Sequence, residues 1–170
     1  VIDIPKMFNL IRKNFFLNFS IIIFIFILDR ISKIYVIKLS EENNVNELFS
    51  SKYLDINLIW NEGIAFGLFS FSEKYAYNLL TLLIGLVIIL IFYMISKNDG
   101  LRKYSLIMII GGALGNLYDR IFFKAVPDFI DFHIGSFHWF IFNVSDIFIS
   151  TGVILMILIE IIFDKNKNYE

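Results

Sequence analysis

The sequence predicts an all-α membrane protein, a four-transmembrane-helix bundle with a small β/loop subdomain and an amphipathic loop on its outer face. The first observation is composition: the 170-residue chain has a mean hydropathy of +0.72 and is 58% hydrophobic but only 18% charged. A soluble domain of this size would leave much of that apolar surface wet. The second is four apolar segments of helical length, and the third is the basic residues beside them.

Composition also limits the partners and the architecture. The net charge is −1, so no nucleic-acid partner is expected. The chain has no cysteine, which excludes a disulfide framework and thiolate metal sites. No repeat or long linker divides the sequence, so residues 1–170 are expected to form one integral membrane domain.

The first helix is expected at 15–37. The segment before it carries Lys6, Arg12 and Lys13, which predicts a cytoplasmic N-terminus by the positive-inside rule. A cleavable signal peptide would have a shorter apolar core followed by small residues, so this helix is expected to be retained. After it, 40–72 is a mixed outer segment in which the alternating LDINLIW predicts short strands or an interfacial loop.

The remaining helices are expected at 75–96, 104–121 and 142–163. The turn KNDGLRK between the second and third is basic and therefore cytoplasmic, and 122–141 is expected to be an aromatic outer loop. The polar tail DKNKNYE places the C-terminus inside as well. Both termini of this multi-pass protein are thus expected in the cytoplasm.

Three aspartates are predicted to meet at one depth. At about 1.5 Å per residue, Asp29 lies about 20 Å, Asp119 about 24 Å and Asp146 about 27 Å from the cytoplasmic ends of their helices. Ionisable groups are costly in a membrane and commonly mark function. A polar layer near the outer edge of the hydrocarbon core is therefore expected.

Part of this layer has a structural interpretation. Asp29 and Lys33 are four residues apart and can pair on one helix face. Arg120 carries a fixed charge that can pair with Asp29 or Asp119 and hold the helices together. The small residues at 111, 112 and 115 suit close helix packing in lipid.

The segment 61–67, NEGIAFG, has two alternative interpretations. Its glycines permit close backbone approach, so the loop can press a peptide or lipid against the helices. A plain turn explains the same glycines.

Asp128 and Asp146 are the candidate catalytic residues, because neither has a cation at helical spacing. Asp128 follows Pro127, and Asp146 lies one turn after Asn143, which can cap the fourth helix. Two carboxylates in a low-dielectric site share a proton. One can then take a proton from water while the other polarises a scissile carbonyl, as in an aspartic protease.

Other chemistries are less well supported. His133 and His138 are five residues apart with no companion cysteine or glutamate at a metal-ligand spacing, so neither a metal nor a cofactor is predicted. Ser145 and Ser150 have no histidine or lysine at an informative spacing. A proton-coupled transporter subunit is the alternative function, although its carboxylates would be expected near the midplane. A purely structural subunit leaves Asp128 and Asp146 unexplained.

Five blocks along nearly the whole chain resemble the lipoprotein signal peptidase, or signal peptidase II, family. These blocks are DRISK (29–33), NEGIAFG (61–67), GGALGNLYDR (111–120), VPDF (126–129) and FNVSD (142–146). The resemblance implies a bacterial aspartic endopeptidase of the cytoplasmic membrane, active near the outer face. Its substrate would be a diacylglyceryl-modified prolipoprotein, cut just before the lipidated cysteine, in contact with membrane lipid. A monomer without cofactor is expected.

The resemblance also implies roles for individual residues. Asp128 and Asp146 would be the catalytic pair, and the residues that bind substrate or position the pair would be Asn61, Gly63, Phe66, Asn116 and Asn143. The residues that support the site would be Asp29, Lys33, Asp119 and Arg120. Ser145 stands where the family commonly has alanine, and its hydroxyl can hydrogen-bond a neighbouring aspartate.

Overall fold

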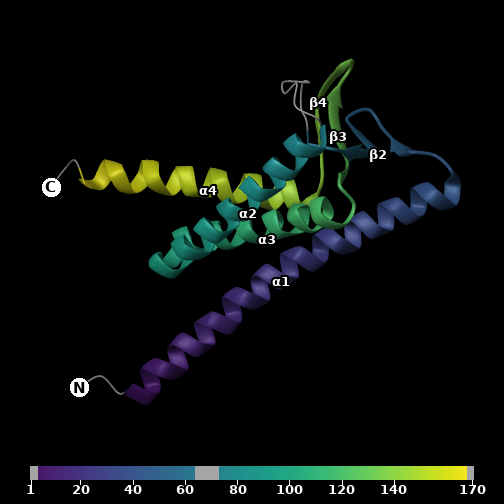
Figure 1. Cartoon of the computed structure of the whole chain (residues 1–170). Helices are drawn as coiled ribbons and strands as arrows, with labels where there is room; N and C mark the ends of the chain where they lie inside the picture. Colours follow the sequence, from purple (N-terminus) through teal and green to yellow (C-terminus); the bar gives the residue numbers. More distant parts are fainter. Residues whose placement is uncertain (1–3, 64–72, 168–170) are drawn as a thin grey trace.

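Four helices and a four-stranded sheet make up the fold (Figure 1). The computed structural model describes residues 4–63 and 73–167. The helices are α1 (Ile4–Asn43), α2 (Glu73–Lys97), α3 (Gly100–Phe122) and α4 (Val144–Lys167). The strands are β1 (Glu47–Ser50), β2 (Leu54–Asn61), β3 (Val126–Ile134) and β4 (Phe137–Phe142), paired antiparallel in sequence order.

All four predicted helices are present, with different ends. The helix expected at 15–37 extends to Asn43, and the helix expected from 142 begins at Val144 because β4 continues to Phe142. Three helices are long and apolar enough to cross a membrane in the described part of the chain: Phe15–Asn43, Tyr77–Lys97 and Val144–Ile162. The third predicted helix, α3, is not among them, since its sequence carries charged and polar residues at both ends.

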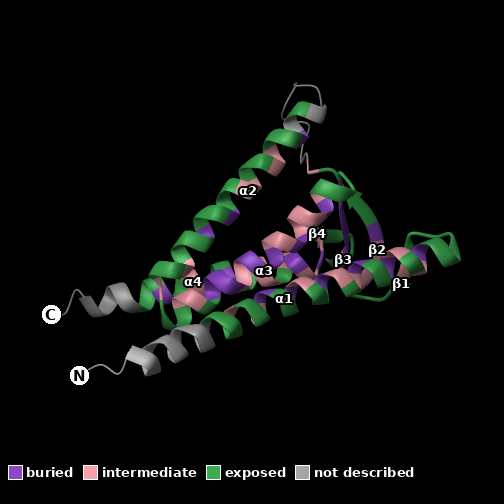
Figure 2. Ribbon diagram, turned by 60° about the horizontal axis from the view of Figure 1, so that its bottom comes forward, coloured by how far each residue is buried: buried purple, intermediate pink, exposed green. Residues whose placement is uncertain are grey.

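Helix α3 is the centre of the helical layer and packs against α1, α2 and α4. Its buried side includes Ile107 and Ile110, which join Ile22 of α1 and Ile88 of α2 in the main apolar core. Figure 2 shows buried and intermediate residues concentrated on α3, whereas much of α1 and α2 is exposed. Large apolar side chains cover these exposed surfaces, such as Ile89, which is 66% exposed. Such surfaces suit contact with lipid.

The expectation of an aromatic loop at 122–141 was wrong, because this segment forms the β3–β4 hairpin. Gly135 supplies the turn with a φ of 61°. Aromatic side chains occupy consecutive positions in FHWFIF, so the usual alternation of a half-buried strand is not visible there. For 40–72, the predicted alternative of short strands is confirmed by β1 and β2.

The sheet lies where α3 ends and α4 begins, on the side away from the start of α1 and the end of α4 (Figure 1). It packs against α1 through a second apolar cluster of Val36, Leu58 and Phe129. This arrangement brings the last strand residues next to the first turn of α4.

Candidate functional site

Two acidic and two basic side chains form a buried cluster between α1 and α3. Lys33 Nζ lies 2.9 Å from Asp29 and 2.7 Å from Asp119, and Arg30 contacts the same two carboxylates. Asp29, Asp119 and Lys33 are fully buried. Because the two positive and two negative charges balance, the cluster has no net charge to solvate, which lowers the cost of burying it.

The predicted pairing of Arg120 with Asp29 or Asp119 was wrong, since Arg30 of α1 takes that place. The Arg120 guanidinium instead lies 5.9 Å from the Tyr77 ring. Its buried Nε and Nη1 have no hydrogen-bond partner among the described residues. Arg30 and Arg120 each follow an aspartate directly in the sequence. Nothing in that local spacing indicates which arginine pairs with Asp119.

Asn116 joins this cluster to α4. Its side-chain oxygen accepts a 2.9 Å hydrogen bond from Lys33, and its amide donates a 2.8 Å hydrogen bond to Asp146. The predicted convergence of polar groups from α1, α3 and α4 is thus confirmed.

Asn143 caps α4, as the sequence suggested, and also bridges the two candidate catalytic aspartates. Its side-chain oxygen accepts from the Asp146 backbone N–H at 3.2 Å, while its own backbone N–H donates to the Asp146 carboxylate at 3.1 Å. This reciprocal pattern is a capping box. The Asn143 amide, fully buried, additionally donates a 2.6 Å hydrogen bond to Asp128.

Asp128 is only 4% exposed, near the start of β3. Its second oxygen accepts a 2.9 Å hydrogen bond from the side-chain amide of Asn61, at the end of β2. Burial raises the pKa of Asp128 and the negative charge of Asp146 adds to this, while the amides of Asn61 and Asn143 partly oppose it. Such a shift favours the protonated form.

Asn61 also shapes the first turn of the NEGIAFG segment. Its side-chain oxygen accepts a 2.7 Å hydrogen bond from the backbone N–H of Gly63, which has a φ of 82°. A side chain at Gly63 would collide with Arg120 and with Leu80, which lies 2.9 Å from the position of a Cβ. Glycine is therefore favoured here by its backbone conformation, and a side chain would also displace the ends of the Arg120 and Leu80 side chains. Phe66, the other predicted residue of this segment, lies outside the described residues.

An open cavity of about 380 Å³ reaches Asp146. Its walls are mostly apolar and come from the hairpin and α4: Phe132, Trp139, Phe140, Phe142, Ile147, Ser150, Thr151 and Ile154. The half-buried Asp146 carboxylate thus borders a space that an apolar molecule can enter.

Ser145 does not make the hydrogen bond that the sequence suggested for it. Its buried hydroxyl has no partner among the described residues, whereas its backbone N–H donates a 3.0 Å hydrogen bond to Asp29. The residue therefore connects α4 to the charge cluster through its main chain, and the hydroxyl adds nothing to that connection.

Among the residues that the structure describes, one group of side chains that could hold a metal lies on the β3–β4 hairpin. Asp131, His133 and His138 bring one ligand atom each within 4.8 Å of one another. Asp131 was not predicted as a companion of the two histidines, although its i, i+2 spacing from His133 places both side chains on one face of a strand.

Known proteins resemble this chain along most of its length. Residues 21–163 match a family model described as signal peptidase (SPase) II. The lipoprotein signal peptidase of Pelagibacter ubique (strain HTCC1062) is 51% identical over 158 residues, which cover 93% of this chain and 95% of the relative. That of Aquifex aeolicus (strain VF5) is 39% identical over 153 residues, which cover 88% of this chain and 89% of the relative.

A solved structure is similar as well. A bacterial membrane enzyme determined by the in meso method at 2.3 Å resolution superposes with a TM-score of 0.70 at 28% identity. The similarity covers 88% of this chain and 90% of that one.

Proposed function

The chain belongs to the signal peptidase II family, peptidases of lipoprotein signal peptides, and we propose that it cuts diacylglyceryl-modified prolipoproteins immediately before the lipidated cysteine. Asp128 and Asp146 are the proposed catalytic residues of this aspartic endopeptidase. The observation that carries the proposal is Asn143, which hydrogen-bonds both carboxylates at once.

The different surroundings of the two aspartates assign their roles. Burial favours a protonated Asp128, whose O–H can donate to the scissile carbonyl oxygen. Asp146 is less buried than Asp128 and borders the open cavity, so it is the carboxylate better placed to meet a water molecule. Asp146 is therefore the base and Asp128 the acid.

Hydrolysis then proceeds in two proton-balanced steps. Asp146 takes a proton from water as the water oxygen bonds to the carbonyl carbon, and Asp128 gives its proton to the carbonyl oxygen. In the second step the C–N bond breaks. The proton on Asp146 passes to the leaving nitrogen, and Asp128 recovers a proton from the tetrahedral intermediate as the new carboxyl group forms. The Asp128–Asp146 pair, the catalytic dyad, thus returns to its initial protonation state.

The fold suits a substrate that is part lipid and part peptide. We propose that all four helices cross the bacterial cytoplasmic membrane, with α3 shielded by the others and both termini in the cytoplasm. The sheet then lies at the outer face, and the apolar cavity bordering Asp146 takes substrate at the lipid boundary. The protein is proposed to act as a monomer.

The turn at Asn61 and Gly63 is proposed to help hold the peptide over the dyad, together with Phe66 of the same segment. Asn61 links this turn directly to Asp128, so a peptide that orders the turn also orders the acid. Asp29, Lys33 and Asp119 support the site from beneath by fixing Asn116 and the first turn of α4.

The test is an assay of purified protein in detergent with one precursor peptide in diacylated and non-lipidated forms. We expect cleavage of the diacylated form alone, at the bond before the modified cysteine. Equal cleavage of both forms would contradict the proposed substrate requirement.

A further inference from the structure

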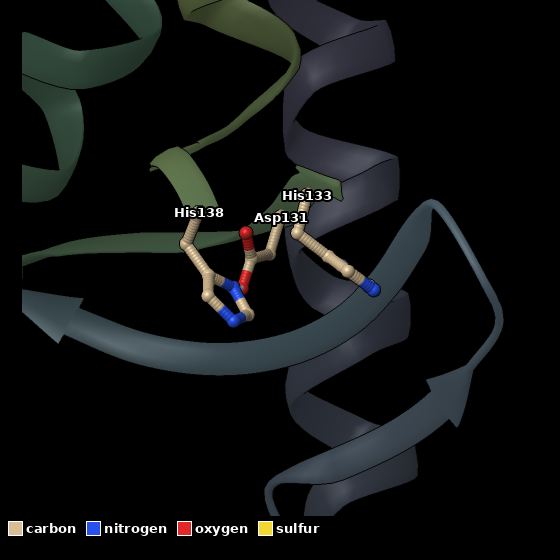
Figure 3. A group of neighbouring side chains, drawn as sticks. All are labelled: Asp131, His133 and His138. Carbon is tan, nitrogen blue, oxygen red and sulfur yellow. Dashed lines mark hydrogen bonds and ion pairs between the residues drawn. The ribbon is translucent and has the colours of Figure 1, made fainter. Parts of the chain in front are cut away.

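Asp131, His133 and His138 gather on the β3–β4 hairpin (Figure 3). His138 Nδ1 lies 2.8 Å from Asp131 Oδ2, and the two imidazole rings stack with centroids 5.0 Å apart. One ligand atom of each residue lies within 4.8 Å of the others, so one ion can contact all three once the two stacked imidazole rings turn toward it.

Strand geometry explains the gathering. Asp131 and His133 are two residues apart on β3, and His133 is paired directly with His138 of β4. Directly paired residues in antiparallel strands project side chains to the same face. On the other edge of β3, Asp55 of β2 is paired with Asp131, and its Oδ2 lies 3.6 Å from His133 Nδ1.

Two of these polar atoms lack partners, which the hairpin geometry alone does not explain. Asp131 is 5% exposed, yet its Oδ1 has no hydrogen-bond partner among the described residues, and neither does the buried His133 Nδ1. Buried polar groups in native proteins are nearly always satisfied, and an exception indicates a missing ligand such as an ion or water.

We propose that this cluster binds one Zn²⁺ ion through Asp131, His133 and His138. Two imidazole nitrogens and one carboxylate oxygen are ligands that zinc prefers. Asp55 or water completes a tetrahedron. The ion takes the place of the contact between His138 and Asp131 and gives the orphaned His133 Nδ1 a partner.

The site has both an entrance and a closed side. The His138 side chain is 52% exposed, whereas those of Asp131 and His133 are 8% and 11% exposed. An ion can therefore reach His138 from solvent and settle against the buried carboxylate. Once bound, it cross-links β3 and β4 at the loop end of the hairpin.

The zinc site shares no residue with the Asp128–Asp146 pair, and its role is to stiffen the hairpin. The zinc proposal does not depend on the proposed peptidase mechanism, because it is tested by metal stoichiometry and thermal stability. Cleavage of the lipidated precursor is expected to persist after chelation.

The experiment uses the full-length chain without an affinity tag, stripped with a chelator and titrated with ZnCl₂. We expect one Zn²⁺ per chain, a rise in melting temperature, and tetrahedral cobalt d–d absorption when Co²⁺ replaces zinc. His138→Ala and Asp131→Asn should each weaken zinc binding at least about tenfold, since loss of even an outer-sphere partner has such an effect.

Asp99→Asn is the matched control, because this carboxylate is fully exposed and distant in sequence from the cluster. It should bind zinc like the parent. Because the His138 side chain is half exposed, His138→Ala should retain the fold, which circular dichroism checks. A stoichiometry far below one, or unchanged affinity in both cluster variants, would overturn the proposal.

Discussion

Lys33 donates a hydrogen bond to the side-chain oxygen of Asn116 at 2.9 Å. Lysine has only donors, so this contact fixes which end of the amide faces α1. The NH₂ group must then face Asp146, to which it donates at 2.8 Å. The buried charge of Lys33 on α1 thereby orients the Asn116 amide of α3 toward the Asp146 carboxylate of α4.

Asn116→Ala should consequently reduce kcat more than it raises KM. Removing a positioning residue affects the arrangement of the base in the transition state more than substrate affinity. We expect a loss of about 10- to 100-fold, the usual range for groups that orient a functional ligand. Steady-state kinetics with a lipidated peptide measure it, and a pure KM effect would contradict the orienting role.

Asp128→Asn and Asp146→Asn should each lower cleavage by at least about 10²- to 10⁴-fold, the contribution of positioned general acids and bases. Both variants should still insert and fold. Asp99→Asn, at a fully exposed position, is the control and should cleave normally. Near-normal cleavage by either dyad variant would remove that residue from the mechanism.

The pH profile of kcat/KM should show a fall on its alkaline side as Asp128 loses its proton. Because the pKa of Asp128 is raised above its usual 3.8, the fall occurs at higher pH than for an ordinary aspartate. The amide of Asn61 lowers this pKa, so Asn61→Ala should move the alkaline fall to still higher pH. Movement toward lower pH would contradict the assignment of Asp128 as the acid.

Two lysine–acid pairs at i, i+4 on α1 allow a controlled comparison of burial. Lys33→Met should destabilise the protein by about 3–5 kcal/mol, because Arg30 alone then faces the two buried carboxylates and one negative charge is left uncompensated. Lys38→Met breaks the pair between Lys38 and Glu42, whose side chains are 71% and 60% exposed, respectively. This change should alter the stability little. Thermal unfolding in detergent measures both, and equal losses would contradict the burial effect.

The sequence predicted the helices and the convergence of polar groups from α1, α3 and α4, because both depend on local hydropathy and helical rise. The cap at Asn143 was also predicted, but the reciprocal hydrogen bond to the Asp146 carboxylate was not. The contact between Asn61 and Asp128 was not, because it joins residues 67 positions apart and depends on the register of β2 against β3. Arg30 was missed for a similar reason: only the packed helices decide which arginine reaches Asp119.

Gly115 and Gly85 provide a matched pair of glycine-to-alanine changes. A Cβ at Gly115 would overlap the Ser145 hydroxyl and lie 2.6 Å from the Asp29 carboxylate, whereas a Cβ at Gly85 meets nothing within 4 Å. Gly115→Ala should cost about 1–3 kcal/mol, the range for overpacking a close-packed site. Gly85→Ala should be neutral or stabilising. Melting temperatures distinguish the two, and a harmless Gly115→Ala would contradict the close approach of α3 to α1 and α4.

Helix α4 contributes Asp146 and follows the other helices and strands that the structure describes. On the proposed mechanism, a polypeptide still emerging from the ribosome has its acid on β3 but not its base. The nascent protein therefore cannot hydrolyse anything in the translocation machinery through which it passes. Proteolytic competence arrives only once α4 has been synthesised and has docked beside α3.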